Sequence, residues 1–204
     1  MTTEILAPTA ENLIRAGKMI RAGELAAFPT ETVYGLGADG LNEEACRKIY
    51  AAKERPADKP LTLHVASFAQ IEELAEISAA AEKLIAAFLP GPLTVILPKK
   101  SIVPSSFASV GIRFPANKIA QDFIKAAGVP IAAPSANISG KPAPATAREV
   151  FENLSGRVGI ILDGGACEVG VSSTVIDLTA APKILRQGTI SVAAIEKILS
   201  ERTD

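Results

Sequence analysis

Apolar residues recur every three to four positions in six segments of the chain, which is the spacing that places them on one face of a helix. These segments are 11–21, 43–53, 79–89, 118–127, 147–154 and 192–199. An S-x-x-Q pattern at 67–70 and a T-x-x-E pattern at 146–149 fit capping boxes at helix starts. Gly23 and Gly128 stand where a left-handed residue commonly ends a helix, each just before an apolar run. The pattern therefore predicts helices that alternate with strands.

Shorter apolar or alternating runs predict the strands. They cover 24–28, 61–66, 93–97, 110–114, 129–133, 158–162, 174–178 and 184–186. Several are apolar on both faces, as in the run 160–162, which favours strands covered by helices on both sides. We therefore expect an α/β fold with a twisted, mixed β-sheet flanked by helices. The 204 residues are 48% hydrophobic, without a shift in composition or a repeat, so residues 1–204 are expected to form a single domain.

Charge and cysteine usage narrow the classes of function. The 21 Lys and Arg residues balance 22 Asp and Glu residues, giving a net charge of −1, without the basic excess of a typical nucleic-acid binder. The near-neutral net charge still permits a local cluster of basic residues in a cleft. Two distant cysteines and one histidine argue against a structural zinc site or a disulfide framework. The N-terminus resembles no signal peptide and no run of about 18 apolar residues occurs, so we expect a cytoplasmic protein without a membrane partner.

The segment 29–37, Pro-Thr-Glu-Thr-Val-Tyr-Gly-Leu-Gly, follows the apolar run 25–28 and is rich in hydroxyl groups. We interpret it as a glycine-ended loop that can hold a small polar ligand. The glycines at 35, 37 and 40 formally match the dinucleotide fingerprint G-x-G-x-x-G. Six residues separate Phe28 from Gly35 and the next helix begins after Asn42, which argues against that fold. The glycines are expected to permit a tight loop with positive φ.

Three cations follow the predicted helix 43–53 closely. Lys53, Arg55 and Lys59 lie in a segment stiffened by prolines, and lysine and arginine both bind phosphate. The alternative is a solvated turn in which the cations only favour the helix dipole.

His64 and Arg113 are polar residues inside predicted strands. His64 is the only histidine and shares a strand face with Thr62, and both a structural and a functional role are open. A serine hydrolase would have to use it, yet no G-x-S-x-G motif occurs. Arg113 lies in an apolar strand, where an unpaired guanidinium is costly to bury. It needs an anionic partner such as a ligand carboxylate, unless the strand is an exposed edge.

Hydroxyls, amides and glycines also follow two other predicted strands, at 134–140 and 186–188, and hydroxyls at 172–174 precede a third. Ligands bind open α/β sheets beyond the carboxyl ends of strands. Each segment alone is compatible with an ordinary turn. Together they predict that distant segments converge on one ligand cleft.

These motifs, taken in order, resemble the YrdC-like family of threonylcarbamoyl-adenylate synthases. The resemblance rests on residues 28–36, K-x-R-P at 53–56, PGPLT at 90–94, SAN at 135–137, STV at 173–175 and R-x-G at 186–188. It covers nearly the whole chain and implies the YrdC-like fold, in the short bacterial-type form without the C-terminal extension.

The resemblance implies a nucleotidyltransferase that converts L-threonine, bicarbonate and ATP into threonylcarbamoyl-AMP and pyrophosphate, for t6A modification at position 37 of tRNA. It implies Mg²⁺ bound with ATP and a downstream tRNA threonylcarbamoyl transferase complex as partner. An RNA-binding module without adenylation activity is the alternative, and weak RNA binding is compatible with either. A carbamoyl-phosphate-using transferase would need zinc-finger and acylphosphatase-like parts, which this sequence lacks.

The resemblance also assigns residues by position. The threonine site comprises Thr32, His64, Arg113, Ser173 and the main chain of Ala133. The ATP site comprises Arg55, Lys59, Ser109, Ser135, Asn137, Arg186 and the main chain near Ala143. Lys53 and Arg55 are the implied catalytic cations. Ser109 stands where relatives often have threonine, and the short loop 99–108 is expected to close over the cleft.

Overall fold

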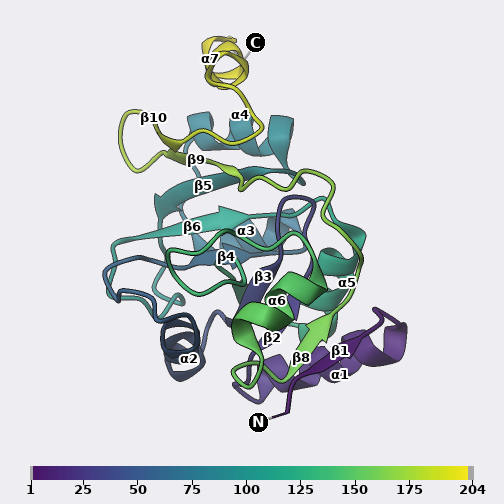
Figure 1. Ribbon diagram of the computed structural model, residues 1–204. Helices are drawn as coiled ribbons and strands as arrows, with labels where there is room; N and C mark the ends of the chain where they lie inside the picture. Colours follow the sequence, from purple (N-terminus) through teal and green to yellow (C-terminus); the bar gives the residue numbers. More distant parts are fainter. Residues whose placement is uncertain (1, 202–204) are drawn as a thin grey trace.

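The computed structural model describes residues 2–201 (Figure 1). Its helices are α1 (Ala10–Arg21), α2 (Glu43–Lys53), α3 (Phe68–Leu74), α4 (Ala79–Phe88), α5 (Lys118–Ala127), α6 (Ala147–Leu154) and α7 (Val192–Ser200). Its strands are β1 (Glu4–Leu6), β2 (Ala26–Phe28), β3 (Gly35–Asp39), β4 (Thr62–His64), β5 (Leu93–Pro98), β6 (Ser109–Arg113), β7 (Ile131–Ala132), β8 (Ile160–Leu162), β9 (Thr174–Asp177) and β10 (Lys183–Arg186).

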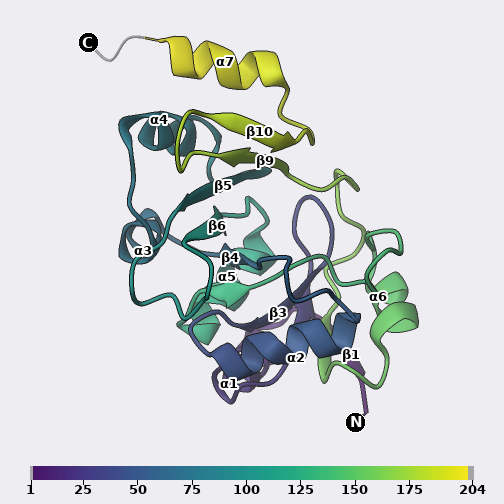
Figure 2. The same ribbon diagram turned by 90° about the vertical axis from the view of Figure 1, so that its left-hand side faces the viewer.

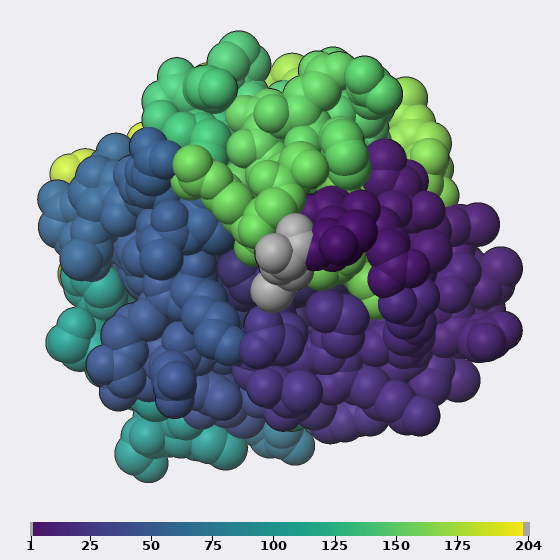
Figure 3. Space-filling view, turned by 60° about the horizontal axis from the view of Figure 1, so that its bottom comes forward, coloured from purple at the N-terminus to yellow at the C-terminus, as the bar shows by residue number. Residues whose placement is uncertain are grey.

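The strands form one continuous mixed sheet, in the order β1-β8-β2-β3-β7-β4-β6-β5-β9-β10. Pairs such as β4 with β6 and β5 with β9 are parallel, whereas β3 pairs antiparallel with both β2 and β7. The N-terminal strand β1 pairs with β8, and Figure 3 shows the dark purple N-terminal segment against a green part of the surface. The sheet confirms the predicted α/β class.

Helices α1 and α5 cover one face of the sheet at its β8-β2-β3-β7 end. Ile20 of α1 and Phe123 of α5 join Phe28, Ile131 and other strand residues in one apolar cluster. A Cβ atom at Gly17 would lie 2.7 Å from the backbone of α5, so only glycine permits this close approach of the two helices.

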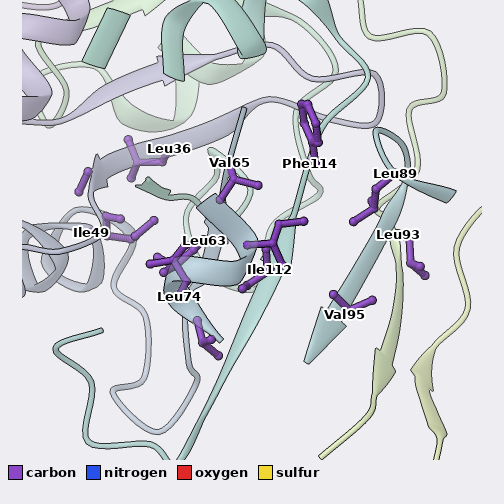
Figure 4. Close-up of a cluster of buried hydrophobic side chains, with 14 of the residues drawn as sticks. Leu36, Ile49, Leu63, Val65, Leu74, Leu89, Leu93, Val95, Ile112 and Phe114 are labelled. Atoms are coloured by element: carbon purple, nitrogen blue, oxygen red, sulfur yellow. The ribbon is translucent and has the colours of Figure 1, made fainter. Parts of the chain in front are cut away.

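The remaining helices pack against the opposite face. Leu63, Val65 and Ile112 from the sheet meet Ile49 of α2 and Leu74 of α3 in the larger apolar cluster (Figure 4). Helix α7 lies beyond β10 and next to α4 (Figure 2). The two faces of the sheet are therefore covered unequally by helices. The face that packs against α1 and α5 is covered only at its β8-β2-β3-β7 end.

The six predicted helices are confirmed, and α3 is an additional one. Ser67 caps α3 by accepting a hydrogen bond from the Gln70 amide, but the Gln70 side chain accepts from Ala66, so the capping box is incomplete. The box at Thr146 is complete. Gly23 and Gly128 have φ of +78° and +71°, as the sequence predicts.

The predicted loop 29–37 is confirmed for residues 29–34, which form no helix or strand, but the prediction was wrong for its glycines. Residues Gly35–Asp39 form the central strand β3, and neither Gly35 nor Gly37 has a positive φ. The glycines are needed for space, since a Cβ at Gly37 would come within 2.8 Å of the Ile131 side chain. The strand β1 was also missed. Among residues 2–201, no helix combines the length and apolar character needed to cross a membrane.

Candidate active site

A cleft lies on the part of the sheet face that α1 and α5 leave open. It encloses about 660 Å³, including the part open to solvent. It is lined by Thr30, Val33, Tyr34, Gly35, Arg55, Pro60, Thr62, His64, Thr94, Arg113, Ala133, Pro134, Ser135, Ser172, Ser173 and Arg186. Residues far apart in the sequence thus meet in one cavity.

The strands β4, β6 and β5 supply polar side chains to this cleft. His64 pairs with Arg113 in the parallel register of β4 and β6, so both side chains point to the same face. Thr62 lies on that face too, while Leu63 points into the core, as the alternation predicts. Strand β6 is internal to the sheet, which excludes the edge-strand interpretation of Arg113.

The anionic partner of Arg113 is Glu31. Nη2 of Arg113 lies 2.8 Å from Oε1 of Glu31, and the side chains are only 6% and 8% exposed. The geometry is that of an ion pair without a well-directed hydrogen bond, because both oxygens of Glu31 and Nε of Arg113 have no hydrogen-bond partner among the described residues. The sequence predicted the need for an anion but did not identify this carboxylate. The position of Glu31 in the hydroxyl-rich segment 29–37 was the one sequence feature that could have identified it.

His64 is buried against the edge of Phe28, with ring centroids 5.9 Å apart. Burial and then the nearby charge of Arg113 lower the pKa of His64 to about 3. The imidazole is therefore neutral at physiological pH. Its Nδ1 is buried and has no hydrogen-bond partner among the described residues.

Ser173 and Arg186 are held together at the end of the cleft formed by β9 and β10. The Arg186 guanidinium donates to the Ser173 carbonyl from Nε at 3.0 Å and from Nη2 at 2.9 Å. The Ser173 hydroxyl lies 2.8 Å from that of Thr94. Burial, and then the charge of Arg113, lower the pKa of Arg186.

Arg55 borders the cleft from the segment that joins α2 to β4. Its guanidinium donates to the carbonyls of Lys59 and Pro60, at 3.3 and 3.0 Å. These bonds hold the proline-containing turn closed and leave other guanidinium donors free. Burial lowers the pKa of Arg55. A guanidinium still stays charged at neutral pH, so Arg55, Arg113 and Arg186 place three positive charges around one cavity.

The structure brings together seven of the predicted site residues: Arg55, His64, Arg113, Ala133, Ser135, Ser173 and Arg186. Six others lie off the cavity wall: Thr32, Lys53, Lys59, Ser109, Asn137 and Ala143. Thr30 lines the cleft and its hydroxyl bonds that of Thr32, at 2.9 Å. Lys59 is exposed, and Ala143 lies in the loop between β7 and α6.

Ser109 lines a neighbouring cavity of about 880 Å³, which shares Pro60 with the cleft. Residues 103–107 of the loop predicted to close over the site line this second cavity. Lys53 donates from its ammonium group to the carbonyls of Ser135 and Asn137, and is only 2% exposed. It therefore lies behind the loop that carries Ser135.

Glu31, Thr62, Thr94 and Tyr34 were not assigned to the site from the sequence. The alternation that placed Thr62 beside His64 was a usable signal, and Thr94 and Tyr34 both belong to quoted motifs. Within residues 2–201, no group of three or more His, Cys, Asp or Glu residues could hold a metal ion. The arrangement is suited to binding anions, since no acidic side chain lines the cleft directly.

Comparison with known proteins identifies close relatives. The Sua5/YciO/YrdC family, described as "Telomere recombination", matches residues 18–188. The chain is 52% identical to the threonylcarbamoyl-AMP synthase of Pyrococcus abyssi over 91% of its length, and 43% identical to that of Bacillus subtilis over 97%. These matches cover 56% and 59% of the two relatives, so the chain spans little more than half of their length.

A solved structure gives the same result. The structure of P. abyssi Sua5 complexed with L-threonine matches with a TM-score of 0.92 and 48% identity, covering 98% of this chain and 61% of that one. The fold of the described residues is therefore that of Sua5.

Proposed function

Because this chain belongs to the Sua5/YciO/YrdC family, we propose that it forms threonylcarbamoyl-AMP and pyrophosphate from L-threonine, bicarbonate and ATP. The observation that carries the proposal is the convergence of three arginines and several hydroxyls on one cleft. Such a cleft can hold a triphosphate beside an amino acid. The relatives named as threonylcarbamoyl-AMP synthases and the threonine complex of P. abyssi Sua5 support this choice of substrates.

The threonine end of the cleft is assigned to Arg113, His64 and Ser173. Arg113 faces the cavity with its charge partly balanced from behind by Glu31, and it receives the carboxylate of threonine. The neutral imidazole of His64, the hydroxyl of Ser173 and the main chain of Ala133 line the same end. Thr32 acts there through Thr30, whose hydroxyl it contacts.

The nucleotide end is assigned to Arg55, Ser135 and Arg186. The amine of threonine adds to carbon dioxide, which forms a carbamate and releases a proton to solvent, or condenses with bicarbonate, which forms the same carbamate and releases water. A carbamate oxygen attacks the α-phosphorus, and the bond from that phosphorus to the bridging oxygen breaks, so that its electron pair leaves with pyrophosphate. Negative charge increases in the transition state, and the guanidinium groups stabilise it. A histidine with a pKa of about 3 contributes polarity and is a poor general base near pH 7.

Magnesium is proposed to enter with ATP as part of the nucleotide substrate, held by the phosphate oxygens. The residues that line the cleft include no carboxylate to bind the ion directly. The product is proposed to pass to a tRNA threonylcarbamoyl transferase for t6A formation. ATP, threonine and bicarbonate are all available in the cytoplasm, which supports a cytoplasmic location.

The decisive experiment is detection of threonylcarbamoyl-AMP by mass spectrometry after incubation of the purified protein with MgATP, L-threonine and bicarbonate. ¹³C-bicarbonate should raise the product mass by about one unit, because the carbamate carbon derives from it. Omission of threonine or bicarbonate is the control. Binding of ATP without any threonine-dependent product or pyrophosphate would contradict the proposal.

A further inference from the structure

Lys53 is the last residue of α2, and its side chain does not line the cleft. Its ammonium group donates to the carbonyl oxygens of Ser135 and Asn137, and its own carbonyl accepts from the Ser139 amide at 2.8 Å. One lysine thus makes three contacts with the loop 135–139. At 2% exposure it has no surface left for a ligand in this conformation.

The same loop is closed on itself by Asn137. The Asn137 side chain donates from Nδ2 to the carbonyls of Ile138 and Lys141, at 2.9 and 2.7 Å. The amide of Ala136 donates to the carbonyl of Tyr34 at 2.8 Å. The loop is therefore fixed from both sides, and of its two serines and its asparagine only Ser135 lines the cleft.

We propose that Lys53 is a positioning residue, which sets the place of the Ser135 hydroxyl in the cleft and makes no contact with phosphate. This inference rests on the proposed function in one respect, which is that ATP is the ligand contacted by Ser135. The alternative is a direct contact with the triphosphate. That contact would require the ammonium group to leave one buried and one partly buried carbonyl, each of which would then lose this donor.

The burial of Lys53 is consistent with this role. Burial, and then the charge of Arg55, lower its pKa to about 8. The head group can donate to both carbonyls in its charged and its neutral form, since an amine keeps two hydrogens. Arg55, two residues later, shows the contrast, because it lines the cleft and retains free donors.

The proposal predicts a lack of additivity between Lys53 and Ser135. ATP affinity is measured by calorimetry for Lys53→Met, Ser135→Ala and the double variant. Loss of one hydroxyl contact to a phosphate should weaken ATP binding about tenfold. If Lys53 acts through Ser135, Lys53→Met weakens binding by a similar factor, and the double variant stays within about twofold of the weaker single variant. A double variant weakened about 100-fold, the product of both effects, would overturn the proposal.

Hydrogen exchange of the ligand-free protein gives a second measurement that does not depend on catalysis. Lys53→Met should raise the exchange rate of the amides of residues 136–139 at least tenfold, because the loop loses its anchor. Lys48→Met is the matched control, since Lys48 lies on the same helix and pairs with Glu24 at 2.8 Å, outside the cleft. It should leave both exchange and ATP affinity unchanged.

If the hydrogen-exchange rates of residues 136–139 stay unchanged in Lys53→Met, Lys53 does not anchor the loop. This conclusion holds whatever product the protein makes. If Lys53→Met does not fold, Lys53→Leu, which also removes the donor hydrogens, is measured in its place with the same two outcomes. Failure of the proposed function would show as an absence of threonylcarbamoyl-AMP in the wild type while the exchange result stands.

Discussion

At the scale of single residues, Arg113 of the cleft wall forms a buried ion pair with Glu31. Removing one partner of such a pair leaves an uncompensated charge, which typically costs about 3–5 kcal/mol. We expect Glu31→Gln to lower the free energy of unfolding by this amount in urea denaturation. The double variant Glu31→Gln with Arg113→Met should be more stable than Glu31→Gln alone, since no unpaired charge remains. Equal stability of the wild type and Glu31→Gln would contradict the pairing.

Arg113 and Arg55 should separate the two substrates in kinetic measurements. Arg113→Ala is expected to raise the KM for threonine about 30- to 1,000-fold, which corresponds to about 2–4 kcal/mol for a charge-assisted contact. Arg55→Ala should instead lower the rate of adenylate formation at saturating threonine, measured by pyrophosphate release. The two variants serve as controls for each other. Identical kinetic effects of both changes would refute the division of the cleft into two ends.

The buried His64 should make the stability of the protein depend on pH. It is the only histidine in the chain, so no other imidazole contributes to this dependence. Its pKa is about 3 in the folded state, compared with about 6.5 when unfolded, so below pH 6.5 the unfolded state binds a proton that the folded state does not. The stability from neutral His64 is complete above pH 6.5 and is lost as the pH falls towards 3. Between pH 8 and pH 5 the loss should be about 2 kcal/mol.

Urea denaturation at each pH measures this loss, and His64→Gln is the control because it cannot titrate. The histidine signals in NMR spectra should also stay at their neutral positions down to pH 5. A titration midpoint near 6.5 in the folded protein would contradict the buried, neutral imidazole.

At the scale of secondary structure, the sequence predicted the helices well and the centre of the sheet less well. Periodicity and caps identify helices because both signals are local. The strand β3 was interpreted as a loop, since glycine is usually a turn residue. The side chains that leave no room for a Cβ at 35 and 37 include Phe28 of the preceding strand β2 and Ile131 of β7. Strand β7 is far away in the sequence, so local patterns do not reveal this crowding. The short strand β1 depends on its partner β8 in the same way.

Gly188, at the end of β10, is a second glycine that is needed for space. A Cβ atom there would lie 2.3 Å from the Ser172 carbonyl oxygen and 2.6 Å from the Thr174 nitrogen. Gly188→Ala should therefore displace the segment that follows Arg186 and break the hydrogen bonds from this arginine to Ser173. We expect the KM values for both ATP and threonine to rise at least tenfold, with a lower melting temperature.

Thr189→Ala is the control for that change, because residue 189 is exposed and adjacent. It should leave the kinetic constants and the melting temperature unchanged. Unchanged KM values in Gly188→Ala would contradict this prediction. They would show that the backbone near residues 172–174 can move to accommodate the added Cβ without displacing Arg186.

At the scale of the whole molecule, the composition predicted a near-neutral protein, and the fold concentrates positive charge in one place. The motifs correctly indicated that residues from 55 to 186 converge on a cleft. Within each motif, the sequence did not indicate which side chains face the cavity and which point elsewhere. Lys53 and Asn137 bond to the main chain behind the loop, whereas Ser135 faces the cleft, and this choice depends on hydrogen bonds between distant segments.

This concentration of charge predicts different salt sensitivity for the two substrates. In the proposed reaction, ATP brings several negative charges into a cleft lined by Arg55, Arg113 and Arg186, whereas threonine is a zwitterion without net charge. Raising the KCl concentration from about 0.05 to 0.5 M shortens the screening length from roughly 14 to 4 Å. The KM for ATP, measured by pyrophosphate release at fixed free Mg²⁺, should then rise about tenfold. The KM for threonine should change less than twofold, since only its carboxylate meets a partly balanced cation. Equal shifts of both constants would contradict a cleft whose net positive charge acts mainly on the nucleotide.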